Sequence, residues 1–519
     1  MFLSSGSGPL IAITMTNTRQ LVHEDDWKRR AVWASGPEGG YFRLETGDTA
    51  DVPVRLFVTQ KLLAEAEPTL YRQVVNATRF PGAKLVCVTP DVHYGYGVPV
   101  GCVILTDRDE GSVAMGPVGF DIGCGMMSAR SNVPAELATP DRKMEFNREV
   151  SRRVNLGAGG KSVKLGKLSE KELQNLVRGG AEYYVDKYGA SFDRSRAERH
   201  RIPVADTWDI PWGGKGSPER GLDQLGSLGG GNHFIELQRC EESGTLFVQV
   251  HTGSRGFGHG LATNYFQMAK DERPGEITDL DLGYFTPASK HFESYLNAVA
   301  AGGNYAILNR LVIYEQIADA FRKVFKENLE LVYEISHNLV QAEEHPEFGK
   351  VWVHRKGATR AFPGGHPALA GTIWEKTGHP VLIPGSNRDY SYILMPEAGA
   401  HKSGFSVNHG AGRRLSRGEA MRQLDQRKVD EQYRRDDILV NLDGRVPLDE
   451  SAQCYKSAEE VVSAVVGAGL ARVEHTLWPL ASIKGTEEGA ARDRRRKNKA
   501  KERSRDRDRD TARKTKAHY

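Results

Sequence analysis

Cysteine is scarce in this sequence, which has five cysteines among 519 residues, at widely separated positions. Secreted domains that depend on disulfides carry a denser and usually even set. The scarcity, odd number and scatter exclude a disulfide framework. Each thiol is therefore either a buried core side chain or a ligand.

Long hydrophobic runs are also missing. No stretch approaches the roughly 20 apolar residues that span a bilayer. The apolar segment 9–15 has no basic region before it, as a secretory signal would have. We therefore expect a cytoplasmic protein that does not associate with a membrane.

The sequence has no proline-rich or serine-rich linker and no repeat of fixed period. Its 39% hydrophobic and 27% charged residues, with 56 glycines, are typical of a globular enzyme that buries a substantial core. We expect residues 1–490 to form one domain of mixed α and β structure.

Positive charge is concentrated at the C-terminus. Residues 491–519 contain 14 Lys or Arg against 5 Asp or Glu, a net charge of +9 in a chain whose formal charge is +4. The segment lacks apolar periodicity, which predicts disorder. It is either a solubilising terminus or an arm that follows phosphates.

Helix and strand signals alternate along residues 1–490. Capping-box patterns, Ser169 with Glu172 and Ser457 with Glu460, predict helices over 169–188 and 457–466. A longer helix is expected over 291–325, interrupted at Gly302 and Gly303. The β-branched or aromatic runs 85–89, 246–250, 331–335 and 381–383 predict buried strands.

Polar or glycine-containing segments follow each of these strands. They are Asp91 and His93, then His251, then His337 and Asn338, then Pro384, Gly385 and Ser386. Strand ends are positions where a rigid sheet can aim side chains and bare amides at a ligand. The pattern indicates one shared site.

Candidate metal ligands lie in glycine-rich turns. Asp121 and Cys124 stand three apart in GFDIGCG (119–125), although a buried structural cysteine is the better explanation of Cys124 alone. His233, His251 and His337 occupy similar turns, where an ordinary core histidine is less expected. Carboxylate, thiolate and imidazole together suit a borderline ion such as Zn or Mn.

Glycine-rich runs at 228–233, 384–387 and 409–413 offer backbone N–H groups that suit phosphate. None matches a P-loop, and each alone is equally a tight turn. His409 is followed by Gly-Ala-Gly and Arg413, which leaves space for a bulky group and supplies a cation for anionic oxygen. This setting favours a nucleophile attacking phosphorus.

These motifs resemble the RtcB family of RNA-splicing and RNA-repair ligases over about 90–485. The matching motifs are PDVHYGYG (90–97), GFDIGCG, GNHFIE (231–236), HTGSRG (251–256), RKGA (355–358), PGS (384–386) and HGAGR (409–413). The resemblance implies an α+β fold whose mixed sheets, flanked by helices, surround a central metal and nucleotide cleft.

The resemblance also implies a GTP-dependent and Mn-dependent RNA ligase. Two Mn ions would be held by Asp121, Cys124, His233, His251 and His337. His409 would attack the α-phosphorus of GTP and carry GMP, which then activates an RNA 3′-phosphate, made where needed from a 2′,3′-cyclic phosphate, for attack by a 5′-hydroxyl. An archease-type activating partner follows by family analogy.

By the same matching, GTP contacts come from several short segments, with Glu236 as an acceptor for guanine N–H groups. The residues are Asn232, His233, Phe234, Ile235, Glu236, His337, Asn338, Pro384, Gly385, Ser386, Asn387, Ser391, His409, Gly410, Ala411, Gly412, Tyr455 and Lys484.

The sequence departs from the family pattern at four places. Asn387 and Arg388 replace the common Met-Gly after PGS, which places a cation near the expected triphosphate. Ser336 stands where many members have a second histidine. The segment 191–219 and the basic tail have no assignable counterpart.

Two other functions are compatible with the sequence. One is a metal-dependent phosphodiesterase or guanylyltransferase paralogue that seals RNA poorly, which the altered loop at 387–388 permits. The other is a noncatalytic RNA-binding protein that uses its basic tail.

Overall fold

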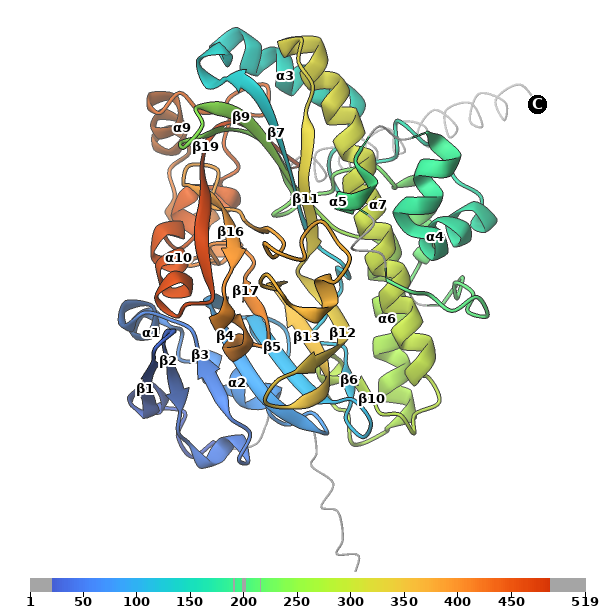
Figure 1. Cartoon of the computed structure of the whole chain (residues 1–519), viewed down its shortest axis with the longest axis vertical. Helices are drawn as coiled ribbons and strands as arrows, with labels where there is room; N and C mark the ends of the chain where they lie inside the picture. The colour runs from blue at the N-terminus through green and yellow to red at the C-terminus, as the bar shows by residue number, and fades with distance from the viewer. Residues whose placement is uncertain (1–20, 190–191, 198–201, 215, 486–519) are drawn as a thin grey trace, which may run out of the picture.

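The computed structural model describes residues 21–189, 192–197, 202–214 and 216–485. The predicted basic tail, 491–519, lies outside the described residues, and so does part of 191–219. Central sheets are flanked by helices, as Figure 1 shows. The expected α+β class is confirmed, and none of the described helices combines the length and apolar character needed to cross a membrane.

Two large mixed sheets and two strand pairs make up the β structure of the described residues. The seven-stranded sheet has the order β1 (Ala31–Gly36), β2 (Gly39–Leu44), β3 (Val54–Leu56), β4 (Ala83–His93), β5 (Val100–Asp107), β13 (Gly349–Lys356) and β12 (Asn338–His345). The eight-stranded sheet has the order β11 (Glu330–Ser336), β7 (Gly125–Pro134), β9 (Thr245–Thr252), β8 (Phe234–Cys240), β19 (Ala471–Lys484), β16 (Ser391–Pro396) and β15 (Val381–Ile383), with β18 (Leu439–Val440) parallel to β19. The pairs are β10 (Tyr284–Phe285) with β6 (Val113–Ala114) and β14 (Ala358–Arg360) with β17 (Ser406–Asn408).

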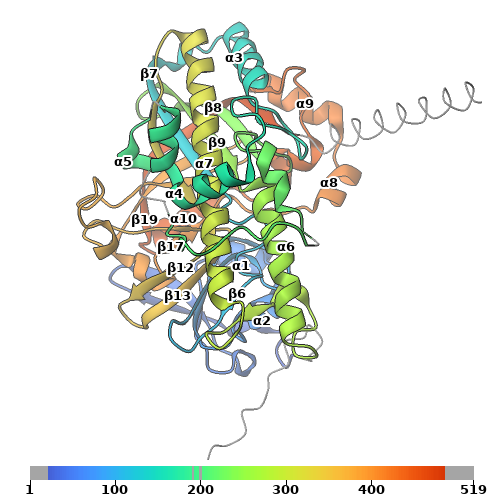
Figure 2. The same ribbon diagram turned by 90° about the vertical axis from the view of Figure 1, so that its right-hand side faces the viewer.

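Helices cover the outside of the sheets. They are α1 (Gln60–Glu65), α2 (Leu70–Ala77), α3 (Pro140–Arg153), α4 (Glu170–Tyr188), α5 (Arg194–Ala197), α6 (Arg255–Glu272), α7 (Phe292–Phe325), α8 (Arg417–Gln423), α9 (Gln426–Arg435) and α10 (Ala458–Gly467). Figure 2 shows α6 and α7 along one face, and α7 packs on β7, β9 and β11. The largest apolar core extends from Leu21 to Ile483 and includes most of α7.

The four predicted strands are confirmed, each within or equal to an observed strand: β4, β9, β11 and β15. Both predicted helix starts are also confirmed, because the Ser169 and Ser457 side chains accept hydrogen bonds from the backbone of Glu172 and Glu460. Glu460 does not turn back to complete its box, since its carboxylate accepts a hydrogen bond from Thr59.

The predicted break at Gly302 and Gly303 is wrong, because α7 runs through both glycines without interruption. Their role is close packing. A Cβ on Gly302 would lie 2.9 Å from Ile122, and one on Gly123 would lie 2.9 Å from the Cα of Gly303. The missing side chains let the loop that carries Asp121 press against the helix.

Candidate metal and nucleotide site

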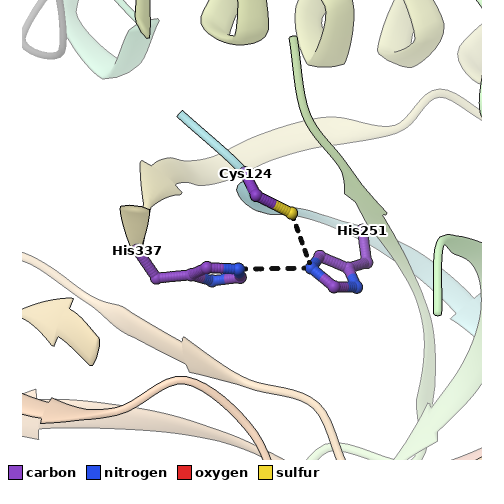
Figure 3. A group of neighbouring side chains, drawn as sticks. All are labelled: Cys124, His251 and His337. Carbon is purple, nitrogen blue, oxygen red and sulfur yellow. Dashed lines mark hydrogen bonds between the residues drawn. The ribbon is translucent and has the colours of Figure 1, made fainter. Parts of the chain in front are cut away.

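Three candidate ligands meet at one end of the eight-stranded sheet. Cys124 immediately precedes β7, the strand between β9 and β11. Its Sγ lies 3.2 Å from Nε2 of His251 in β9, and this Nε2 lies 3.3 Å from Nε2 of His337, just after β11. Figure 3 shows the thiol and both rings pointing toward one another. Gly125 pairs with Thr252 on one side and Ser336 on the other, and this register aligns the three ligands.

A second group of ligands shares the same thiol. Nε2 of His233, just before β8, lies 3.6 Å from Sγ of Cys124 and 3.1 Å from Oδ2 of Asp121. In each triad the donor atoms lie within 4.8 Å of one another. The structure therefore brings all five predicted metal ligands together, with Cys124 common to both triads.

Backbone carbonyls orient two of the rings. Nδ1 of His233 lies 3.0 Å from the Leu228 carbonyl, and Nδ1 of His251 lies 3.1 Å from that of Asn232. A proton on Nδ1 leaves the Nε2 lone pair for an ion, the usual arrangement around metal-binding histidines. Burial also lowers the pKa of His251 and His337 well below its usual value, so both rings are neutral.

The charge balance of the cluster fits a divalent cation. Burial alone would raise the pKa of Asp121, but the hydrogen bond to His233 and nearby positive charge hold it at about 2. Burial and Asp121 raise the pKa of the Cys124 thiol well above its usual range. A cation would supply the charge that favours the thiolate. The donor set combines hard and soft ligands, as borderline ions prefer.

Arg310 of α7 holds the ligand-bearing segments from behind. This fully buried side chain donates to the carbonyls of Gly123 (2.7 Å) and Thr252 (3.0 Å) and to Ser336 Oγ (2.7 Å). It is also paired with the buried Glu334. Each of these three segments adjoins a metal ligand. Arg310 was not predicted from the sequence. A charged residue inside the mainly apolar segment 306–314 could have indicated a buried, paired side chain.

The predicted nucleophile, His409, follows β17 and lies beside the cluster. Its ring centroid is 4.9 Å from that of His337. Its Nδ1 lies 2.5 Å from Oδ2 of the buried Asp91, which also accepts from the backbone N–H groups of His409 (3.0 Å) and Gly410 (3.3 Å). Oδ1 of Asp91 accepts from Thr89 at 2.6 Å. An Nδ1 proton held by Asp91 leaves Nε2 as the nucleophilic atom.

Asp91 is a site residue to which the sequence assigned no role beyond its place at a strand end. Burial alone would raise the pKa of its carboxyl, but the His409 ring and hydrogen bonds lower it below the usual value. Asp91 is therefore an anion beside the imidazole. Gly412, at φ +76°, permits this approach, because a Cβ there would lie 2.0 Å from the Asp91 carbonyl oxygen.

The predicted nucleotide contacts come from segments that adjoin one another. Phe234 pairs with Lys484 and Glu236 with Ser482 across β8 and β19. The Gly385 N–H donates to Ser391 Oγ at 3.0 Å. Tyr455 donates to Glu450, whose carboxylate also lies 3.4 Å from Nζ of Lys484. The binding roles of these residues stay predictions.

Glu236 is buried within this region. Gln238 donates to its carboxylate at 2.8 Å, and Lys484 is a neighbouring positive charge. Burial outweighs these two influences and the smaller one of Ser482, and raises the pKa of Glu236 to about 7. A buried carboxylate with so few partners suits a ligand that brings its own N–H donors.

Asn387 and Arg388, two residues that depart from the family pattern, both have partners within the protein. Arg388 donates from Nε to Asp436 at 2.5 Å, so the cation expected near the triphosphate is paired with a carboxylate. Asn387 is buried, its Oδ1 accepts from Tyr433 at 2.5 Å, and its Nδ2 meets no acceptor among the described residues.

Arg413, expected to face anionic oxygen, is instead engaged within the protein. Its guanidinium donates to Glu450 and Tyr455 at 3.3 Å each and to the Asp449 carbonyl at 2.7 Å. A phosphate would have to compete with these acceptors for the Arg413 guanidinium.

Comparison with known proteins agrees with the geometry. The sequence profile described as "tRNA-splicing ligase RtcB" matches residues 73–485. The chain is 36% identical to the tRNA-splicing ligase RtcB of Pyrobaculum aerophilum over 466 residues, which cover 84% of this chain and 95% of that protein. It is also 36% identical to the RNA-splicing ligase RtcB of Mycobacterium tuberculosis, over 80% of this chain and all of that protein. The chain therefore belongs to the RtcB family.

Proposed function

We propose that the protein is a GTP-dependent and Mn-dependent RNA ligase. It joins a 2′,3′-cyclic phosphate or 3′-phosphate end to a 5′-hydroxyl end, in RNA repair or tRNA splicing. The observation that carries this proposal is the placement of His409, oriented by Asp91, beside two ligand triads that share Cys124. Relatives named as RNA ligases support it over most of the chain.

In the first step, Nε2 of His409 attacks the α-phosphorus of GTP and pyrophosphate leaves. Asp91 stabilises the positive charge that the ring gains as the N–P bond forms. The RNA 3′-phosphate then displaces His409 from phosphorus and takes the GMP. Finally the 5′-hydroxyl attacks the activated 3′-phosphate, and GMP leaves.

Asp121, Cys124, His233, His251 and His337 would hold two Mn ions, and Cys124 belongs to both groups of ligands. When bound, the ions would offset the negative charge on the phosphate oxygens during phosphoryl transfer. Glu236 accepts from guanine N–H groups, and Lys484 adds positive charge nearby.

The decisive experiment incubates the purified protein with α-labelled GTP and Mn and maps the labelled residue. We expect one adduct, on His409. His409→Ala should abolish labelling and leave the metal content nearly unchanged, because His409 is not in either triad. Persistent labelling of this variant would exclude His409 as the nucleophile.

Cys124→Ala is the matched test of the metal assignment. Because both triads contain this thiol, the variant should lose Mn and also lose guanylylation and sealing. Unchanged Mn content and full activity would make Cys124 an ordinary core thiol.

RNA with 2′,3′-cyclic-phosphate and 5′-hydroxyl ends separates the ligase from a paralogue that seals poorly. Cleaved or capped RNA without sealed product would favour the phosphodiesterase or guanylyltransferase. The pairing of Arg388 with Asp436 removes one reason to expect that outcome. Deletion of 491–519 should leave guanylylation intact, whereas a noncatalytic RNA-binding protein would lose its affinity for RNA.

We also propose a cytoplasmic location and an activating partner. A cytoplasmic location agrees with an RNA substrate. An archease-type activator would show itself as a rise in guanylylation rate when it is added to the purified ligase.

A further inference from the structure

A second group of metal-binding side chains lies away from the candidate site. Cys240 ends β8, Glu242 lies in the turn that follows, and His475 lies in the neighbouring β19. Sγ of Cys240 is 3.2 Å from Oε2 of Glu242 and 3.7 Å from Nδ1 of His475. The third distance, from this Nδ1 to the Glu242 carboxylate, is 3.9 Å.

These distances fit one ion. A tetrahedral zinc ion with bonds of about 2.0–2.3 Å places its ligand atoms about 3.3–3.6 Å apart. The three measured separations differ from that range by a few tenths of an ångström. Thiolate, imidazole and carboxylate form a donor set that borderline divalent ions accept.

The same geometry argues against a cysteine nucleophile. In a Cys-His-carboxylate relay, the thiol and the carboxylate contact opposite nitrogens of the ring. Here both face Nδ1 of His475. Burial also raises the pKa of the Cys240 thiol, which leaves it protonated and weakly nucleophilic near neutral pH. The three ligand atoms therefore fit a metal-binding site better than a catalytic relay.

Backbone hydrogen bonds hold the three residues in place. The N–H of Glu241 donates to the Thr476 carbonyl, and the N–H of Gly244 donates to the Cys240 carbonyl, each at 2.9 Å. The N–H of Thr476 donates to the Glu242 carboxylate at 3.0 Å. Little reorganisation would be needed to bind an ion.

An ion can reach this group from solvent. Cys240 is buried, but the side chains of Glu242 and His475 are 43% and 29% exposed. Water can therefore complete the coordination. The group is also separate from the candidate site, because His233 precedes the first residue of β8 whereas Cys240 is its last. At about 3.3 Å per strand residue the two lie roughly 20 Å apart.

We propose that Cys240, Glu242 and His475 form a binding site for a zinc-like divalent cation. Binding replaces the thiol proton, which is released to water, and leaves a thiolate bound to the ion. The ion would tie the β8–β9 turn to β19, so its role is to stabilise one end of these two neighbouring strands in the middle of the eight-stranded sheet.

Cobalt is the probe that tests this site, because Co(II) bound to thiolate has a characteristic charge-transfer absorption. The titration uses the full chain with Cys124→Ala, which removes the thiol of the candidate catalytic cluster. We expect this absorption to saturate at one equivalent of Co(II), and excess Zn(II) to abolish it. Adding Cys240→Ser should remove it, whereas adding Cys102→Ser, a change at another buried cysteine, should not.

Two further variants guard against a folding defect at the buried Cys240. His475→Gln and Glu242→Gln alter side chains that are partly exposed, and each should weaken Co(II) binding at least tenfold with an unchanged circular dichroism spectrum. Zn(II) should raise the melting temperature of the Cys124→Ala protein but not of the His475→Gln double variant. An absent thiolate band, or one that survives both Cys240→Ser and His475→Gln, would overturn the proposal.

Discussion

Asp91→Asn tests the negative charge beside His409 separately from the hydrogen bonds that position the ring. In the native protein, Oδ2 of Asp91 accepts three N–H groups and Oδ1 accepts from Thr89. An asparagine can place its oxygen at the Oδ2 position and donate from its nitrogen to the Thr89 hydroxyl. The four hydrogen bonds then persist, and only the negative charge is lost.

The size of the expected effect follows from the positive charge that His409 would gain in the proposed attack on phosphorus. Opposite charges about 4 Å apart interact by about 4 kcal/mol at an effective dielectric constant of about 20. A charge-assisted hydrogen bond exceeds a neutral one by about 1–2 kcal/mol, which sets the lower limit. We expect a loss of about 2–4 kcal/mol, or roughly 30- to 1,000-fold in the rate of guanylylation.

The assay is single-turnover labelling of His409 by α-labelled GTP at saturating nucleotide, with GTP affinity measured separately. The rate should fall while the affinity changes little, because the hydrogen bonds of the Asp91 carboxylate are made within the protein, to Thr89, His409 and Gly410. Thr89→Val is the matched control. It removes one hydrogen bond from the same carboxylate but keeps the charge, so its loss should be below about tenfold. A native rate in Asp91→Asn would refute the reasoning.

Three other predictions concern the nucleotide and the support of the metal ligands. Because burial raises the pKa of Glu236 to about 7, the carboxylate form that we propose to bind guanine is lost as pH falls below 7. Calorimetry should show GTP affinity rising from pH 6 to pH 8, and Glu236→Gln should remove that dependence. The buried amide N–H donor of Asn387 has no acceptor among the described residues, and Asn387 is one of the predicted GTP contacts. Asn387→Met removes this donor, so GTP should bind about two- to tenfold more weakly in the same calorimetric titration. Arg310→Met leaves Glu334 as an unpaired buried charge; denaturant unfolding should show a loss of about 3–5 kcal/mol, and adding Glu334→Gln should recover part of it.

The sequence predicted the elements and residue types that local patterns encode. Each of the four strand predictions came from an apolar run, and each run is a strand because it is buried in a sheet. The candidate ligands were recognisable because Asp, Cys and His stand in glycine-rich turns at strand ends. The glycine pair in α7 was misjudged, since helix propensity describes a glycine in solvent and not one that contacts Ile122.

Contacts between residues that are far apart in the chain could not be predicted from the sequence. Arg388 was expected to face phosphate, but its partner Asp436 stands 48 residues away and nothing local marks it. The same holds for Asp91 and His409, which are 318 residues apart. A sequence motif gives the charge of a side chain. The group that this side chain faces depends on which carboxylate the fold brings close to it.

The arrangement of the cluster links metal binding to strand register. Cys124 precedes the middle of three adjacent strands, His251 lies in the strand on one side and His337 directly follows the strand on the other. Because successive side chains in a strand point to opposite faces, a shift of β9 by one residue would turn His251 away from the thiol. Arg310 bonds to a backbone or side-chain oxygen next to each of these three ligands, and so fixes all three strands against α7. The helix therefore sets the spacing of the donors before any ion binds, and an ion held by them would in turn stabilise the same register.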